Sequence, residues 1–116
     1  MITDTNTIKS TIDFICSISG FIIIDKEDFR AGCPKPVMMI EQKGQSIDEV
    51  IKGIVEELSE STIPMPEKTM VYIESNVFML SDLALLQQSF MEWNVYKHGL
   101  TFKEPESALI RVIIIG

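Results

Sequence analysis

The chain has few of the side chains on which small proteins build metal sites and catalytic centres. Its 116 residues include two cysteines, Cys16 and Cys33, and a single histidine, His98. A structural zinc site needs four cysteine or histidine ligands, and no C-x-x-C pair is present. A histidine-activated nucleophile also needs a placed serine or cysteine and an orienting acid, and no local motif supplies them. We therefore expect no metal and no cofactor, and the sequence favours a protein that is not an enzyme.

Basic residues are also scarce, and only two of them, Arg30 and Arg111, are arginines. Seventeen acidic residues against ten basic ones give a net charge of −7. A surface that binds nucleic acid needs clustered lysine and arginine to neutralise phosphates, whereas these residues are scattered along the chain. The six glycines form neither of the glycine-rich patterns that cradle nucleotide phosphates. The composition therefore argues against nucleic-acid binding and against a phosphate-binding loop.

Long hydrophobic runs are missing as well. Uninterrupted apolar runs, such as 21–24 and 112–115, reach only four residues and are far too short to span a membrane. The N-terminus lacks the basic stretch followed by an apolar one that marks a secretory signal. From these absences we expect a cytoplasmic protein that does not contact membranes. With 116 residues, 46% of them apolar, the chain is long enough for one α/β domain with a single core, residues 1–116.

Apolar periodicity predicts the first elements of that domain. A helix over residues 4–19 is indicated by polar capping residues at its start and by isoleucines spaced along one stripe, with Gly20 placed to end it. The apolar run 21–24 follows as a short strand. Residues 25–36 contain two prolines and a glycine, which predict a loop without regular structure.

The second predicted helix has the clearest pattern in the chain. It follows a strand over 37–41 and begins with Ser46 and Glu49 in the spacing of a capping box. Apolar residues then recur on one face at the spacing of a helix that packs on a core. They are Ile47, Val50, Ile51, Ile54, Val55 and Leu58. The opposite face of this helix is acidic.

The remaining elements alternate between strand and helix. Residues 69–74 predict a third strand. Ser81 caps a third helix that runs to about residue 97, with His98 in its last turn, where positive charge suits the helix dipole. Gly99 is the expected terminator of that helix.

Two further strands, 100–102 and 108–115, complete the order α-β-β-α-β-α-β, which predicts an α/β fold, with α+β as the alternative. We expect two layers: a mixed sheet of about four to five strands with three helices packed on it. The helix between 37–41 and 69–74 predicts a right-handed parallel crossover, and the next helix predicts another. The final strand is apolar on both faces apart from Arg111, so it lies in the sheet centre or pairs with another subunit of a homo-oligomer.

Binding to another protein is the leading functional interpretation, in the manner of an inhibitor, an immunity protein or an adaptor. The loop 25–36 carries Phe29 and Arg30, two residue types that are enriched at interfaces. Met65 lies between two prolines in a stiff loop and is a further candidate for contact. The acidic face of the second helix would meet a basic partner through Glu56, Glu57 and Glu60.

A small-ligand or magnesium-dependent site is the alternative. Asp25, Glu41 and Glu74 lie at strand ends, where ligands of α/β proteins gather, and converging carboxylates can hold Mg²⁺. Arg111 would bind an anionic group of the ligand. The plainer interpretation is that acids mark the points where strands reach water, and that Arg111 pairs with Glu74 or Glu41 across the sheet. A structural oligomer subunit, paired through 108–115, is the third interpretation.

Overall fold

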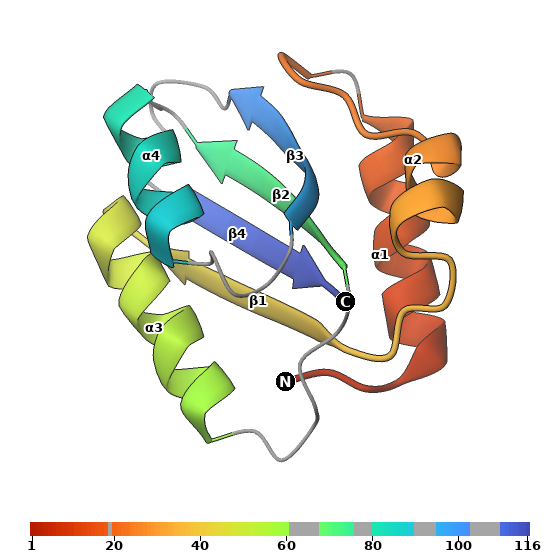
Figure 1. The fold of residues 1–116 in the computed structure, drawn as a ribbon, viewed down its shortest axis with the longest axis horizontal. Coiled ribbons are helices and arrows are strands. Elements are labelled where there is room, and N and C mark those ends of the chain that lie inside the picture. Colours follow the sequence, from red (N-terminus) through yellow and green to blue (C-terminus); the bar gives the residue numbers. More distant parts are fainter. Residues whose placement is uncertain (19, 61–67, 76–79, 90–94, 103–109) are drawn as a thin grey trace.

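Four helices and one four-stranded sheet make up the described part of the chain in the computed structural model (Figure 1). The structure describes residues 1–18, 20–60, 68–75, 80–89, 95–102 and 110–116, with the backbone alone for Leu80, Leu83, Ser89 and 110–114. The strands are β1 (Met39–Gly44), β2 (Thr69–Ser75), β3 (Val95–Phe102) and β4 (Ile110–Ile115). Their order in the sheet is β1-β4-β2-β3, with β2 and β3 parallel and β4 antiparallel to both of its neighbours. The predicted α/β class with a mixed sheet is confirmed.

Helices cover both faces of this sheet, so the fold has three layers where two were expected (Figure 1). On one face lie α1 (Thr5–Ser17) and α2 (Lys26–Gly32), and on the other lie α3 (Ile47–Ser59) and α4 (Leu80–Ser89). The physical reason is that every residue of β2 is buried. A strand that is apolar on both faces needs cover on both sides.

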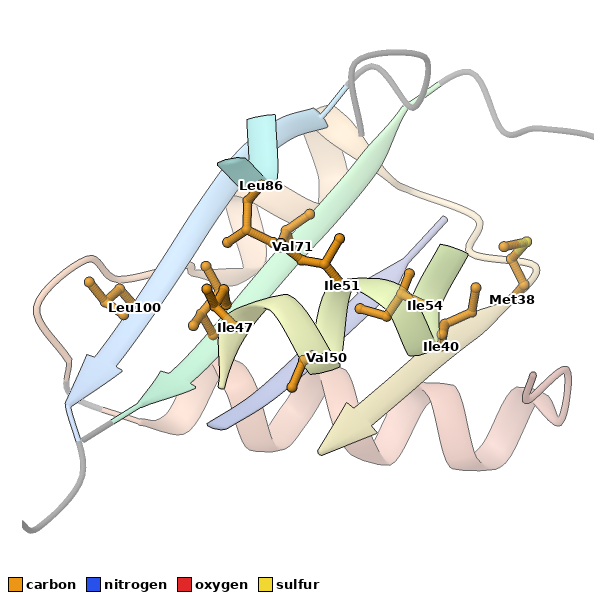
Figure 2. Packing of buried hydrophobic residues seen from close by; sticks show 10 residues of the cluster. Met38, Ile40, Ile47, Val50, Ile51, Ile54, Val71, Leu86 and Leu100 are labelled. Carbon is orange, nitrogen blue, oxygen red and sulfur yellow. The ribbon is translucent and has the colours of Figure 1, made fainter. Parts of the chain in front are cut away.

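The core on the α3 side is built from the predicted helical stripe. Ile47, Val50, Ile51 and Ile54 of α3 are buried against Ile40, Val71 and Ile73 of the sheet, and Leu86 of α4 joins them. Figure 2 shows the α3 side chains lying over the sheet strands. Burial of each such side chain contributes about 1.5–3 kcal/mol. Val55, which belonged to the predicted stripe, is 45% exposed and lies outside this core.

Polar caps define where the helices begin. The Asp4 carboxylate accepts a hydrogen bond from the backbone N–H of Thr7 at 3.0 Å, which starts α1. The Ser46 hydroxyl accepts from the N–H of Glu49 at 3.3 Å, which starts α3. The reciprocal half of the predicted capping box is absent there, because the Glu49 carboxylate accepts from the N–H of Gln45 instead.

The segment between α1 and β1 differs from the prediction. Residues 21–24 do not form a strand of the sheet, since Ile22 makes one isolated antiparallel bridge with Leu100. Residues 25–36 contain the helix α2 rather than an irregular loop throughout. Asp25 and Asp28 form a full capping box that starts this helix, and both prolines follow its end instead of interrupting it.

The third helix is shorter than predicted, and β3 occupies the residues expected at its end. The helix α4 ends at Ser89, whereas His98 and Gly99 lie inside β3. The parallel partner of β2 is therefore β3, and the second crossover does not lead to the final strand. The first crossover is confirmed in direction, because β1 and β2 both run antiparallel to β4. β4 lies between them, so the final strand takes the central position, one of its two predicted places, and homo-oligomer formation stays a prediction.

No helix within the described ranges is long and apolar enough to cross a membrane.

Removal of a core side chain from α3 tests this architecture. Ile54 is fully buried, so Ile54→Ala is expected to lower the free energy of unfolding by about 2–5 kcal/mol. Val55→Ala on the exposed side of the same helix serves as the control and should change it by less than about 0.5 kcal/mol. Urea denaturation followed by circular dichroism measures both. Equal losses in the two variants would contradict the assignment of the buried face.

Candidate interaction surface

Residues 20–24 are held against the sheet edge at three successive points. The N–H of Ile22 donates to the carbonyl of Leu100 at 3.1 Å, and the N–H of Leu100 donates to the carbonyl of Ile22 at 3.0 Å. A Cβ atom at Gly20 would lie 2.5 Å from Thr101 Oγ1, and one at Gly99 would lie 2.7 Å from Ile24 Cδ1. These two glycines permit a contact that larger residues would prevent. The segment is therefore fixed on β3.

Apolar side chains of this segment lie in solvent. Ile24 is buried in the core under α1 and α2, and Ile22 is partly covered. Phe21, at which the backbone bends, is 74% exposed, and Ile23 is 53% exposed. Phe102 at the end of β3 is 47% exposed, and its ring meets that of Phe21 edge to face with centroids 5.6 Å apart. We call Phe21, Ile22, Ile23 and Phe102 the β3-edge surface.

The backbone of this segment presents a free edge. In an antiparallel bridge the paired residue directs both its N–H and its carbonyl toward the partner strand, so its neighbours direct theirs away. Ile22 is the paired residue here. Within the described residues, the backbone N–H and carbonyl groups of Phe21 and Ile23 have no hydrogen-bond partner. Such an edge is available to another extended chain.

A hollow of about 460 Å³ lies between the end of α1 and the start of α2. Six residues line this α1–α2 hollow: Asp13, Cys16, Ser17, Asp25, Lys26 and Glu27. Lys26 Nζ is 3.9 Å from the Asp13 carboxylate, and the Asp25 carboxylate accepts from the N–H of Asp28 at 3.0 Å. Three carboxylates and one ammonium line the hollow, and Arg30 pairs with one of the carboxylates, that of Glu27, so the local charge is negative by one unit.

Asp28 ties α2 to β3 beside this hollow. Its carboxylate accepts hydrogen bonds from the N–H of Asp25 at 3.0 Å and from Lys97 Nζ at 2.7 Å. The backbone hydrogen bond from Asp25, followed by the Lys97 ammonium, holds the pKa of this carboxyl below its usual range. The charge of Asp28 is thus used within the fold.

The predicted partner-binding residues do not form one surface. Phe29 is 5% exposed and packs in the core, so its assignment to a recognition surface is wrong. Arg30 is exposed on α2 and pairs with Glu27 at 2.6 Å. The acidic set lies on α3, across the sheet from α2 (Figure 1). It comprises Glu56 and Glu60, which are exposed, and Glu57, which pairs with the amino group of Met1. Met65 lies outside the described residues.

The register brings the backbone positions of Glu41, Glu74 and Arg111 together in the sheet. It places position 111 of β4 directly opposite Glu74 of β2 and diagonally from Glu41 of β1. Glu74 is 4% exposed and accepts from the Tyr72 hydroxyl at 3.1 Å, and Glu41 is 3.5 Å from Lys43 Nζ. This register favours the cross-strand pairing of Glu74 with Arg111. Within the described residues no group of three acidic, histidine or cysteine side chains is placed to hold a metal.

The thiols and the histidine are held in their neutral forms by burial. Burial raises the pKa of Cys33, whose thiol faces the carbonyl of Ile115 at 3.9 Å, and it also raises the pKa of Cys16. Neither cysteine has the low pKa of a reactive thiolate. The ring of His98 faces the α3–α4 side, where Nε2 is buried without a hydrogen-bond partner among the described residues. Burial lowers the pKa of His98.

Comparison with known proteins gives a similarity of fold. Neither a protein-family model nor a curated protein matches this sequence. Among solved structures, the chain is similar to the empty FtsZ dimer of M. jannaschii, with a TM-score of 0.62 and 15% sequence identity. The match covers 87% of this chain and 33% of that one. The chain therefore spans one third of the length of that protein, and at this identity the similarity concerns the fold alone.

Double substitution tests the interpretation of Glu74 and Arg111 as a structural pair. We expect Glu74→Gln and Arg111→Gln each to lower the free energy of unfolding, because either change leaves the other group in the sheet without its opposite charge. If the two side chains interact, the loss in the double variant should fall short of the summed single losses by about 0.5–3 kcal/mol. Urea titration of all four proteins measures this coupling. Strictly additive losses would contradict the pairing.

The lowered pKa of His98 predicts a loss of stability in acid. The unfolded chain binds a proton near the ordinary pKa of about 6.5, whereas the folded chain resists it to lower pH, so stability falls as pH drops below that value. Urea midpoints at about pH 7.5 and about pH 5.5 should therefore differ more for the native sequence than for His98→Phe. His98 is the chain's only histidine, which makes the comparison specific. The same drop in both proteins would refute the assignment.

Proposed function

We propose that this chain is a protein-binding domain whose partner docks on the β3-edge surface. One observation carries the proposal. Phe21 and Phe102 form an aromatic pair that is exposed to solvent, on a backbone segment that is pinned to the sheet by the Ile22–Leu100 hydrogen bonds. Inhibitor, immunity and adaptor roles are all forms of this function.

The energetics of this surface favour docking over a role in folding. A side chain that remains largely in water contributes little to the stability of the folded chain. Contiguous exposed apolar residues on a small protein mark sites of interaction, and aromatic residues are enriched at the centres of interfaces. Because the segment is already fixed on β3, this chain loses little conformational entropy when a partner binds.

Partner capture with matched surface variants tests the proposal. Phe21→Ser combined with Ile23→Ser should abolish recovery of the partner from extracts of the source cell, because it removes the centre of the apolar surface. The control is Val55→Ser, which changes an exposed apolar residue on α3, across the sheet. Quantitative mass spectrometry compares the three captures. A partner recovered equally with the double variant and the native chain would overturn the proposal.

A further inference from the structure

We infer that the β3-edge surface takes an extended segment of a partner protein, which pairs as a strand with Phe21 and Ile23 and places a lysine or arginine in the α1–α2 hollow. This inference rests on the proposed function and names the chemistry of the partner. Three features carry it: the free backbone edge, the exposed apolar side chains of Phe21 and Ile23, and the sign of the neighbouring charge.

The backbone supplies the first part of the recognition. Ile22 directs its hydrogen-bonding groups inward to Leu100, so those of Phe21 and Ile23 face outward. A strand added on that side would satisfy the N–H and carbonyl groups of both residues. Strand addition of this kind draws its affinity from main-chain hydrogen bonds and its specificity from alternate side chains.

The exposed side chains define what the added strand presents. Phe21 and Ile23 are two residues apart and both exposed, and the ring of Phe102 extends the apolar area at the Phe21 end. Apolar side chains at alternate positions of the partner would lie opposite them, because directly opposed residues on neighbouring strands share a face.

The charge beside the Ile23 end selects a basic residue. Asp25 follows Ile23 by two positions, so their Cα atoms are at most about 7 Å apart. Asp25 lines the α1–α2 hollow together with Asp13 and Glu27, against the single ammonium of Lys26. The next residues of an added strand therefore reach a negative hollow. An exposed cation there would form surface ion pairs and would be steered by the net charge of −7.

Two comparisons within the molecule make the choice of partner specific. A second hollow of about 450 Å³, between the end of α2 and β1, is lined by Lys35 and Lys68 and by no acidic side chain, so the negative sign belongs to the hollow beside the β3-edge surface. A second copy of this chain is a poor occupant, because two chains of net charge −7 repel each other.

Selection of random dodecapeptides displayed on phage against the immobilised chain tests the inference. The selected peptides are expected to carry apolar residues at alternate positions with a lysine or arginine beside them. Phe21→Ser should abolish their binding and Phe21→Leu should largely retain it. On binding, the amide hydrogens of Phe21 and Ile23 should gain protection from exchange with solvent. Peptides that require Phe21 but leave both amides unprotected would overturn strand pairing.

Charge variants test the second half of the inference. Asp13→Asn and Glu27→Gln should each weaken peptide binding about two- to fivefold at low salt, an effect typical of a surface ion pair. Asp48→Asn on α3 and Glu60→Gln at its C-cap, both exposed acids, are the matched controls and should leave binding unchanged. Phe21-dependent peptides that bind the Asp13 and Glu27 variants as tightly as the native chain would overturn the inference and leave the proposed function standing. Peptides whose binding ignores Phe21 would overturn both.

Discussion

Burial of β2 on both faces is the constraint on which the rest of the structure depends. Val71 and Ile73 face α3 and α4, whereas Met70 and Tyr72 face α1 and α2, so neither layer of helices can be removed without exposing the central strand. The layer formed by α1 and α2 also determines the path of the segment that joins them. That segment crosses the outer edge of β3. Its attachment there leaves part of the apolar run 21–24 exposed, and this part belongs to the β3-edge surface.

Local sequence patterns were sufficient to predict an element where that element is long and strongly periodic. Ser46 and the isoleucines after it predicted α3, and the apolar character of the last strand predicted either a central position for β4 or pairing with another subunit. The short helix α2 was missed because seven residues with only Phe29 and Gly32 buried show no stripe, and the prolines after it dominated the interpretation. The start of β3 was missed because the apolar spacing of the predicted third helix continues past Ser89 to Trp93, whereas the pairing of β3 with β2 is a contact between segments distant in sequence.

The β3-edge surface could not be predicted from local sequence patterns, for a related reason. Four apolar residues in a row, 21–24, are typical of a buried strand, and nothing in their composition separates Ile24, which is buried, from Phe21, which is not. The difference arises from one isolated bridge to Leu100 and from glycines that allow the chains to approach. Phe102 joins the surface only because the end of β3 lies beside residue 21. Long-range geometry, which no periodicity encodes, defines the surface.

The sequence suggested acidic residues as a candidate site, whereas several of these carboxylates stabilise the fold and the exposed candidate surface is apolar. Asp25 caps α2, Asp28 holds Lys97, and Glu74 is buried under the Tyr72 hydroxyl, so these carboxylates already have structural partners inside the fold. A carboxylate that is committed to a cap or an internal hydrogen bond is costly to withdraw for catalysis. The exposed rings of Phe21 and Phe102 contact each other instead. The proposed docking function therefore rests on the apolar surface, and the acids beside it support only the proposed preference for a basic partner.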